Sequence, residues 1–172
     1  PSLALRQGRT SSMRLAIDAV KEGRAAAAVS AGNTGALMAM AKVVLRTLPG
    51  IDRPAICGVF PSRARPVVIL DLGANIACNA DTLVQFAVMG TVFARAILGV
   101  EQPRIGLLNV GTEELKGDDV VRRAADMLRA SPPPIRFGGF VEGTDLVEGS
   151  VEVVVTDGFT GNVALKIAEG VA

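Results

Sequence analysis

The chain has 172 residues, enough for an ordinary domain with a buried core. Hydrophobic residues make up 49% and charged residues 20%, which argues against intrinsic disorder, while a net charge of +1 with only 3% aromatic residues argues against a general nucleic-acid binder. The chain contains no histidine, which excludes Ser-His-Asp and Cys-His catalysis and histidine-ligated zinc. Any chemistry must therefore use carboxylates, lysine, arginine, amides, hydroxyls or the substrate itself.

Short β-branched or alanine-rich runs alternate with segments of helical period. In chain order we expect a helix over 10–22, a strand over 25–30, a buried helix over 34–47, strands over 55–60 and 66–73, a helix over 81–98, a strand over 104–110, an amphipathic helix over 118–130, a strand over 151–158 and a helix from about 161. This alternation, with continuously apolar strands, is typical of the α/β class, with a mostly parallel sheet covered by helices. The pattern predicts a single α/β region over 1–172, forming the middle of a longer chain.

The cysteines and the longest uncharged stretch bear on the compartment. Cys57 and Cys78 show no CxxC spacing, so the sequence predicts neither a disulfide framework nor a thiolate metal site, and a reducing cytoplasm fits best. The uncharged stretch over 25–41 carries a polar cluster in its middle, and we therefore predict no transmembrane segment.

Four loops that follow predicted strands are rich in small and polar residues. They are SAGNTGA (30–36), DLGAN (71–75), NVGTEELKG (109–117) and DGFTGN (157–162). Ligands of parallel sheets bind beyond the carboxyl ends of the strands, and glycines and helix N-termini at that edge favour an anion such as phosphate. The same residue types also form ordinary turns and helix caps, so each loop has a purely structural alternative. Neither GxGxxG nor GxxxxGK[ST] occurs.

Lys116 is the cation most suggestive of a functional role. It lies in a glycine-flanked loop, where it could bind phosphate or stabilise an oxyanion, or could simply pair with Glu113 or Glu114 at the surface. Asp71 and Asp157 end strands, where each could orient a ligand or cap the next turn.

Together the four loops carry a family resemblance. SAGNTGALMA, DLGAN followed by QFAVMG, GLLNVGTEELKG and VVVTDGFTGNVALK stand in the order and spacing of the phosphate acyltransferases of bacterial phospholipid synthesis, and essentially all of the chain resembles this PlsX family. The resemblance implies a fold similar to the phosphotransacetylases and the isocitrate/isopropylmalate dehydrogenases. It implies transfer of an acyl group from acyl-[acyl carrier protein] to inorganic phosphate, without cofactor or metal, giving acyl phosphate for glycerol 3-phosphate acylation.

The resemblance also implies a cytoplasmic homodimer that associates peripherally with the membrane through a part of the chain not present here. The catalytic residues we predict are Lys116, Asn75, Asp157 and Asn162. The residues predicted to bind phosphate or substrate are Ser30, Gly32, Asn33, Thr34, Gly35, Asp71, Gly73, Asn109, Gly111 and Gly161. Arg6, Arg9 and Arg14 are predicted to contact the carrier protein. The alternatives are a phosphotransacetylase that acts on coenzyme A thioesters, a nicotinamide-dependent dehydrogenase, and a non-catalytic scaffold that binds the carrier protein.

Overall fold

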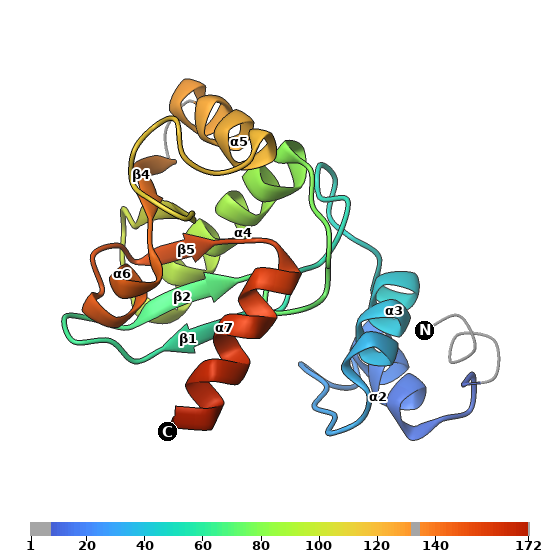
Figure 1. The fold of residues 1–172 in the computed structure, drawn as a ribbon. Helices are drawn as coiled ribbons and strands as arrows, with labels where there is room; N and C mark the ends of the chain where they lie inside the picture. The colour runs from blue at the N-terminus through green and yellow to red at the C-terminus, as the bar shows by residue number, and fades with distance from the viewer. Residues whose placement is uncertain (1–7, 132–134, 172) are drawn as a thin grey trace. The chain divides into compact units, whose positions relative to one another are not determined.

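The computed structural model describes residues 8–131 and 135–171 (Figure 1). The chain divides into two compact units, Pro1–Pro54 and Ala55–Ala172. The described residues of the first unit form two helices, and those of the second unit form the sheet and the other described helices.

The first unit is built from α2 (Ser12–Lys21) and α3 (Thr34–Leu45). The side chain of Ser11 caps α2 by accepting a hydrogen bond from the Arg14 nitrogen, and Gly23 just beyond the helix has a φ of +72°. The two helices pack through an apolar cluster, whose buried members are Ile17, Met40 and Val44.

The predicted strand over 25–30 is wrong. Residues 25–31 are irregular, and none of the described residues of the first unit forms a strand. Alanine is a poor strand former, and in this unit the segment has no strand to pair with. Val29 is 96% exposed, whereas a sheet core would bury it.

The second unit is organised around a five-stranded sheet of order β1-β2-β5-β3-β4. The strands are β1 (Cys57–Phe60), β2 (Val67–Leu70), β3 (Arg104–Leu108), β4 (Arg136–Val141) and β5 (Val153–Val155). Among the strands of the described residues, only β1, at one edge, is antiparallel to its neighbour, so the prediction of a mostly parallel sheet is confirmed. Every residue of β2 and β5 is buried, as expected for strands that are covered on both faces.

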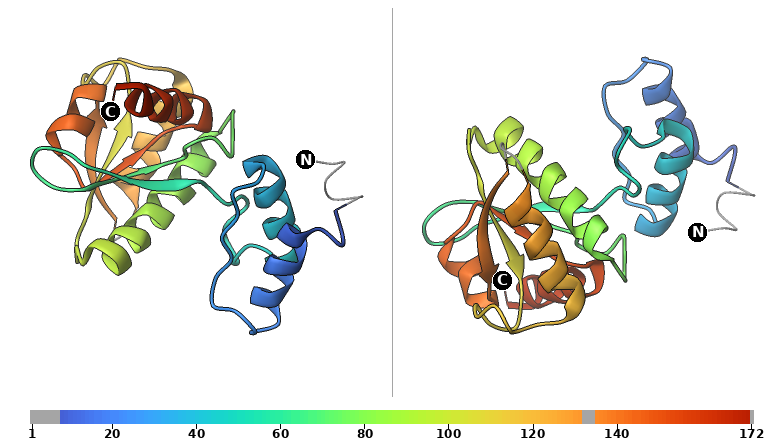
Figure 2. Two further views of the ribbon diagram at one scale, coloured as in Figure 1. Left: turned by 90° about the horizontal axis from the view of Figure 1, so that it is seen from below. Right: turned by 90° about the horizontal axis from the view of Figure 1, so that it is seen from above.

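Helices cover both faces of this sheet (Figure 2). On one face α4 (Ala80–Leu98) and α5 (Asp119–Ala130) pack against the strands in a core that includes Phe86 and Leu128. On the other face lie α6 (Gly143–Glu148) and α7 (Gly158–Val171), with Leu146 and Leu165 packed against buried valines of the strands. The second unit is therefore a three-layer α/β sandwich.

The sequence did not predict β4 or α6 of the second unit. The segment of β4 contains Gly138 and Gly139, and Gly139 has a φ of +105°, close to the register shift between β3 and β4. The six residues of α6 are too few to show a helical period, although Glu142 and Asp145 form a capping box and Gly149 ends the helix in the left-handed region.

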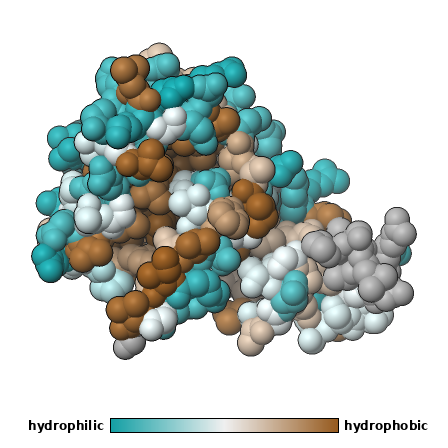
Figure 3. All heavy atoms as spheres, in the orientation of Figure 1, coloured by the Kyte–Doolittle hydropathy of each residue, from teal (hydrophilic) through white to brown (hydrophobic). Residues whose placement is uncertain are grey.

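Among the described helices, α4 has the length and the apolar composition of a membrane-crossing helix, with a mean hydropathy of 1.4. Its buried face, which includes Phe86 and Ala87, belongs to the core beneath the sheet, as in the core helix of a folded domain. A second apolar feature lies on α7, where exposed Phe159, Val163 and Ile167 repeat every four residues and form an apolar stripe visible in Figure 3.

Candidate active site

Three of the four predicted loops do meet at one edge of the sheet. Residues 71–75 follow β2, 109–117 follow β3 and 157–162 follow β5, and these strands are parallel neighbours. A cavity of about 790 Å³ opens beside them. Its lining combines apolar and polar side chains, and exposed Ile76 and Val110 are among the apolar ones. The polar members are Asn109, Asp118, Thr156, Asp157 and Thr160. Asn109 and Asp157 are the predicted site residues among its described lining.

The loop over 71–75 is organised by the buried carboxylate of Asp71. One oxygen accepts hydrogen bonds from the backbone nitrogens of Ile56, Gly73 and Ala74 at 2.9, 3.1 and 3.0 Å. The other oxygen accepts from the backbone nitrogen and the side-chain amide of Asn75 at 2.7 and 2.8 Å. Since both oxygens are engaged and the side chain is inaccessible to solvent, Asp71 shapes the loop and orients Asn75.

The start of α7 packs closely against this loop. A Cβ at Gly161 would collide with the carbonyl oxygen of Asp71, and a Cβ at Gly158 would lie 2.7 Å from the carbonyl oxygen of Asn75. Gly73, with a φ of +134°, lies against the side chain of Asn162. The structure therefore brings Asn75, Gly73 and Asn162 into one corner of the second unit. Only a residue without a side chain fits at position 161, because the backbone of α7 lies against the backbone of Asp71 there.

Asp157 caps α7. Its two carboxylate oxygens accept hydrogen bonds from the backbone nitrogen and the hydroxyl of Thr160, at 2.9 and 2.8 Å. Asp118 caps α5 in the same way, by accepting from the Val121 nitrogen at 2.8 Å. Asp157 and Asp118 thus each cap the N-terminus of a helix beside the cavity. The remaining backbone N–H groups and the positive dipole ends of these helices point toward the sheet edge.

The loop over 109–117 is closed by Asn109. Its side-chain amide donates to the carbonyl oxygens of Gly111 and Lys116, at 3.0 and 3.1 Å. Gly117 has a φ of +84°, and a Cβ there would collide with the Asn109 side chain. A Cβ at Gly111 would meet only the side chains of Glu113 and Lys116, so Gly117 is the glycine that the tight fold of this loop needs.

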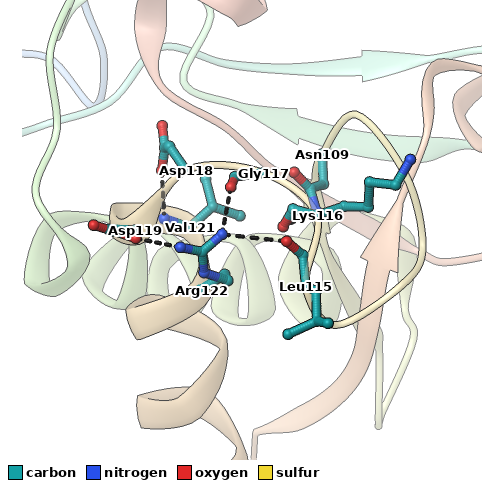
Figure 4. Close-up of polar contacts among 8 residues, drawn as sticks. All are labelled: Asn109, Leu115, Lys116, Gly117, Asp118, Asp119, Val121 and Arg122. Atoms are coloured by element: carbon teal, nitrogen blue, oxygen red, sulfur yellow. Dashed lines mark hydrogen bonds and ion pairs between the residues drawn. The ribbon is translucent and has the colours of Figure 1, made fainter.

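Lys116 lies at the exposed end of that loop without an ion-pair partner among the described residues. Glu114, one of the two glutamates predicted as an alternative partner, instead pairs with Arg129 at 3.1 Å. Figure 4 shows the lysine side chain extending from the loop on the side away from Arg122. Arg122 donates hydrogen bonds to the carbonyl oxygens of Leu115 and Gly117 in this loop. The sequence did not predict this contact, because an arginine on the polar face of an amphipathic helix resembles a solvated charge.

The fourth predicted loop belongs to the first unit, and no strand precedes it. The prediction that all four loops follow strands of one sheet is therefore wrong for the loop from Ser30 to Ala36. Ser30 accepts a hydrogen bond from the Gly32 nitrogen at 3.1 Å, and Asn33 caps α3 by accepting from the Ala36 nitrogen at 2.9 Å. Thr34 and Gly35 form the exposed first turn of that helix.

The predicted carrier-protein residues also lie in the first unit. Arg6 lies outside the described residues. Arg9 is exposed, whereas Arg14 is half-buried and donates from its Nε to both carboxylate oxygens of Asp18 at 3.0 Å.

The cysteines differ in environment, although neither is disulfide-bonded. Burial raises the pKa of the Cys57 thiol to about 11, so this thiol stays protonated at neutral pH. Cys78 lines the cavity. Within the described parts of the chain, no three Cys, Asp or Glu side chains come together as metal ligands would.

Comparison with solved structures shows the fold. A phosphotransacetylase from Streptococcus pyogenes superposes with a TM-score of 0.72 at 23% identity, over 92% of this chain and 54% of that one. The EutD phosphotransacetylase from Staphylococcus aureus gives 0.68 at 17% identity, over 99% of this chain and 62% of that one. The expected similarity to the phosphotransacetylase fold is confirmed.

Comparison of sequences shows the family. A family model described as fatty acid synthesis protein matches residues 1–172. A phosphate acyltransferase from Rhodospirillum centenum is 66% identical over all of this chain and 48% of its own length. Another from Paramagnetospirillum magneticum is 65% identical over 99% of this chain and again 48% of its own length. The chain spans about half the length of these curated relatives, and it belongs to the phosphate acyltransferase family, as the resemblance of its four motifs predicted.

Proposed function

We propose that the protein transfers a fatty acyl group from acyl-[acyl carrier protein] to inorganic phosphate, giving acyl phosphate and free carrier protein. One observation carries this proposal: an exposed lysine without an ion-pair partner in the described chain lies on a closed loop beside an apolar-walled cavity at the sheet edge. Gly117, which follows Lys116, and Asn109, which binds the Lys116 carbonyl, both line that cavity. The family's name for its members supports the same reaction.

The proposed reaction suits a site built without histidine. An unprotonated oxygen of inorganic phosphate, which is a mixture of mono- and dianion near neutral pH, attacks the carbonyl carbon of the thioester, so no general base is needed. The tetrahedral intermediate collapses with cleavage of the C–S bond, and the leaving thiolate, whose parent thiol has a pKa of about 8.5, takes its proton from the bound phosphate or from solvent. The protein's task is to position the reactants and stabilise the oxyanion.

In this proposal Lys116 supplies the positive charge. Asn75 and Asn162, which the structure brings to one corner, orient phosphate or the thioester through their amides. Asp71 and Asp157 act indirectly, since their carboxylates already hold the loop and the start of α7. Exposed Ile76 and Val110, together with half-buried Val121, provide an apolar surface of the cavity for the acyl chain. The phosphate contact predicted for Asn33 and Thr34, at the capped N-terminus of α3, belongs to the first unit and stays a prediction.

The proposed carrier-protein contact belongs to the first unit. Arg9 is the exposed cation of the predicted contact, and Arg14 is partly neutralised by Asp18. We expect Arg9→Glu to raise the KM for acyl-[acyl carrier protein] while kcat changes little. Dimer formation and a cytoplasmic, peripherally membrane-bound location remain proposals that rest on the family resemblance.

The test uses the intact gene product, because the curated relatives are about twice as long as this chain. The protein is incubated with palmitoyl-[acyl carrier protein], with and without inorganic phosphate, and acyl phosphate is trapped as its hydroxamate. We expect hydroxamate only when phosphate and protein are both present. Product from palmitoyl-coenzyme A but none from the carrier thioester would overturn the assignment of the acyl donor. Carrier binding without any product would favour the scaffold.

A further inference from the structure

The guanidinium of Arg122 connects α5 to the loop that carries Lys116. Arg122 lies in the first turn of α5, and its Nη1 donates to the carbonyl oxygens of Gly117 at 2.7 Å and Leu115 at 3.3 Å (Figure 4). Its Nη2 donates to the carboxylate of Asp119 on the same helix. The side chain is 37% exposed, and its planar head is fixed at both edges.

These hydrogen bonds hold the backbone on both sides of Lys116. Leu115 and Gly117 are its chain neighbours, and the carbonyl of Lys116 itself accepts from the Asn109 amide at 3.1 Å. Three consecutive backbone carbonyls are thus each bound by a side chain from outside the segment. Because Asn109 follows β3 directly and Arg122 belongs to α5, the segment is tied both to the end of the sheet and to a packed helix.

The chemistry of arginine suits this arrangement. A guanidinium presents several N–H donors in one rigid plane, so it can bridge two carbonyls and a carboxylate at once. A lysine ammonium at the same position would be a compact charge on a flexible stem, and it would not reproduce the planar arrangement. The neighbouring Arg123 is exposed, and no ion pair or hydrogen bond of its side chain is recorded in the described chain.

We propose that Arg122 is a positioning residue that acts through Lys116, fixing the backbone at 115–117 so that the Lys116 ammonium is directed at the reacting groups. This inference rests on the proposed function, in which Lys116 stabilises charge. A displacement of about 1 Å in a catalytic group can cost on the order of 100-fold in rate. Loss of the arginine should therefore lower kcat more than it changes KM.

The test compares Arg122→Ala, Arg122→Lys and the control Arg123→Ala in the intact gene product, each in the native and in the Lys116→Ala background. We expect Arg122→Ala to lower kcat by about 10- to 100-fold. We expect Arg122→Lys to restore less than half of the decrease in log kcat that Arg122→Ala causes. We expect Arg123→Ala to leave kcat unchanged. In the Lys116→Ala background, Arg122→Ala should cause no further loss. An equal additional loss there would show that Arg122 acts by another route and would overturn the inference.

Hydrogen exchange of the backbone amides over 110–117 separates the structural part of the inference from the function. We expect faster exchange in this loop in Arg122→Ala, with the rest of the second unit unchanged. Exchange no faster than in Arg123→Ala would overturn the inference, whatever the activity. If the native protein forms no acyl phosphate although Arg122→Ala loosens the loop, the proposed function fails while the tie between Arg122 and the loop stands.

Discussion

The carboxylate of Asp71 fixes both the backbone and the side chain of Asn75. A single oxygen accepts from the Asn75 backbone nitrogen at 2.7 Å and from its side-chain amide at 2.8 Å, deep below the surface. The amide of Asn75 therefore cannot turn freely, and its orientation at the sheet edge is set before any ligand arrives.

We predict that Asp71→Asn destabilises the protein. The new amide nitrogen would face backbone N–H groups that now donate to a carboxylate, which leaves buried donors unsatisfied at a cost of about 2–4 kcal/mol. The midpoint of urea unfolding should fall clearly below that of Asp126→Asn, a change on the exposed face of α5. Equal midpoints for the two variants would mean that Asp71 does not hold the loop.

Gly161→Ala is predicted to disturb the contact between α7 and the loop over 71–75. The added methyl group would meet the Asp71 carbonyl oxygen, so the helix must shift, at a cost of about 1–3 kcal/mol. Gly170→Ala is the matched control, because nothing lies within 4 Å of its Cβ position and alanine favours a helix. Thermal unfolding of both variants measures the difference. A Gly161→Ala variant as stable as Gly170→Ala would contradict the close packing.

The Cys57 thiol should make the folded protein sensitive to alkali. Its pKa is about 11 in the folded state and 9.0 without burial, so the folded state retains a proton that the unfolded state loses between these values. The contribution to stability is full below pH 9 and is lost as the pH rises toward 11. Unfolding free energies measured from pH 8 to 11 should fall more steeply in the native protein than in Cys57→Ser. Parallel curves would contradict the raised pKa.

Much of the fold could be predicted because its strongest signals are local. An uninterrupted apolar run predicts β2, and another predicts β5. The amphipathic pattern of residues 118–130 predicts α5. The predicted strand over 25–30 failed because strand formation needs a partner, and alanine-rich residues 25–30 have none in their unit. The sequence did not predict β4, because Gly138 and Gly139 interrupt the alternation of apolar and polar residues in this bulged edge strand.

The site was partly predictable for the same reason. The loops after β2, β3 and β5 could be placed at one edge because parallel strands end together, whereas the functional role that the glycine-flanked position of Lys116 predicts stays a prediction. The sequence left open whether Asp71 contacts a ligand or shapes a turn, and the structure shows that it shapes the loop. Arg122 was not predictable, because its partners are backbone carbonyls of a loop whose path depends on tertiary structure.

The most direct test of the account is the rate of phosphate-dependent acyl transfer in Lys116→Ala, measured with the intact gene product. Lys166→Ala is the control, since that exposed lysine of α7 already pairs with Glu169 at 2.6 Å. We predict that Lys116→Ala lowers kcat by about 100- to 1,000-fold with an unchanged urea midpoint, as expected when one group that stabilises developing charge is removed. Lys166→Ala should match the native enzyme. Native turnover in Lys116→Ala would remove the lysine from the mechanism and contradict the account.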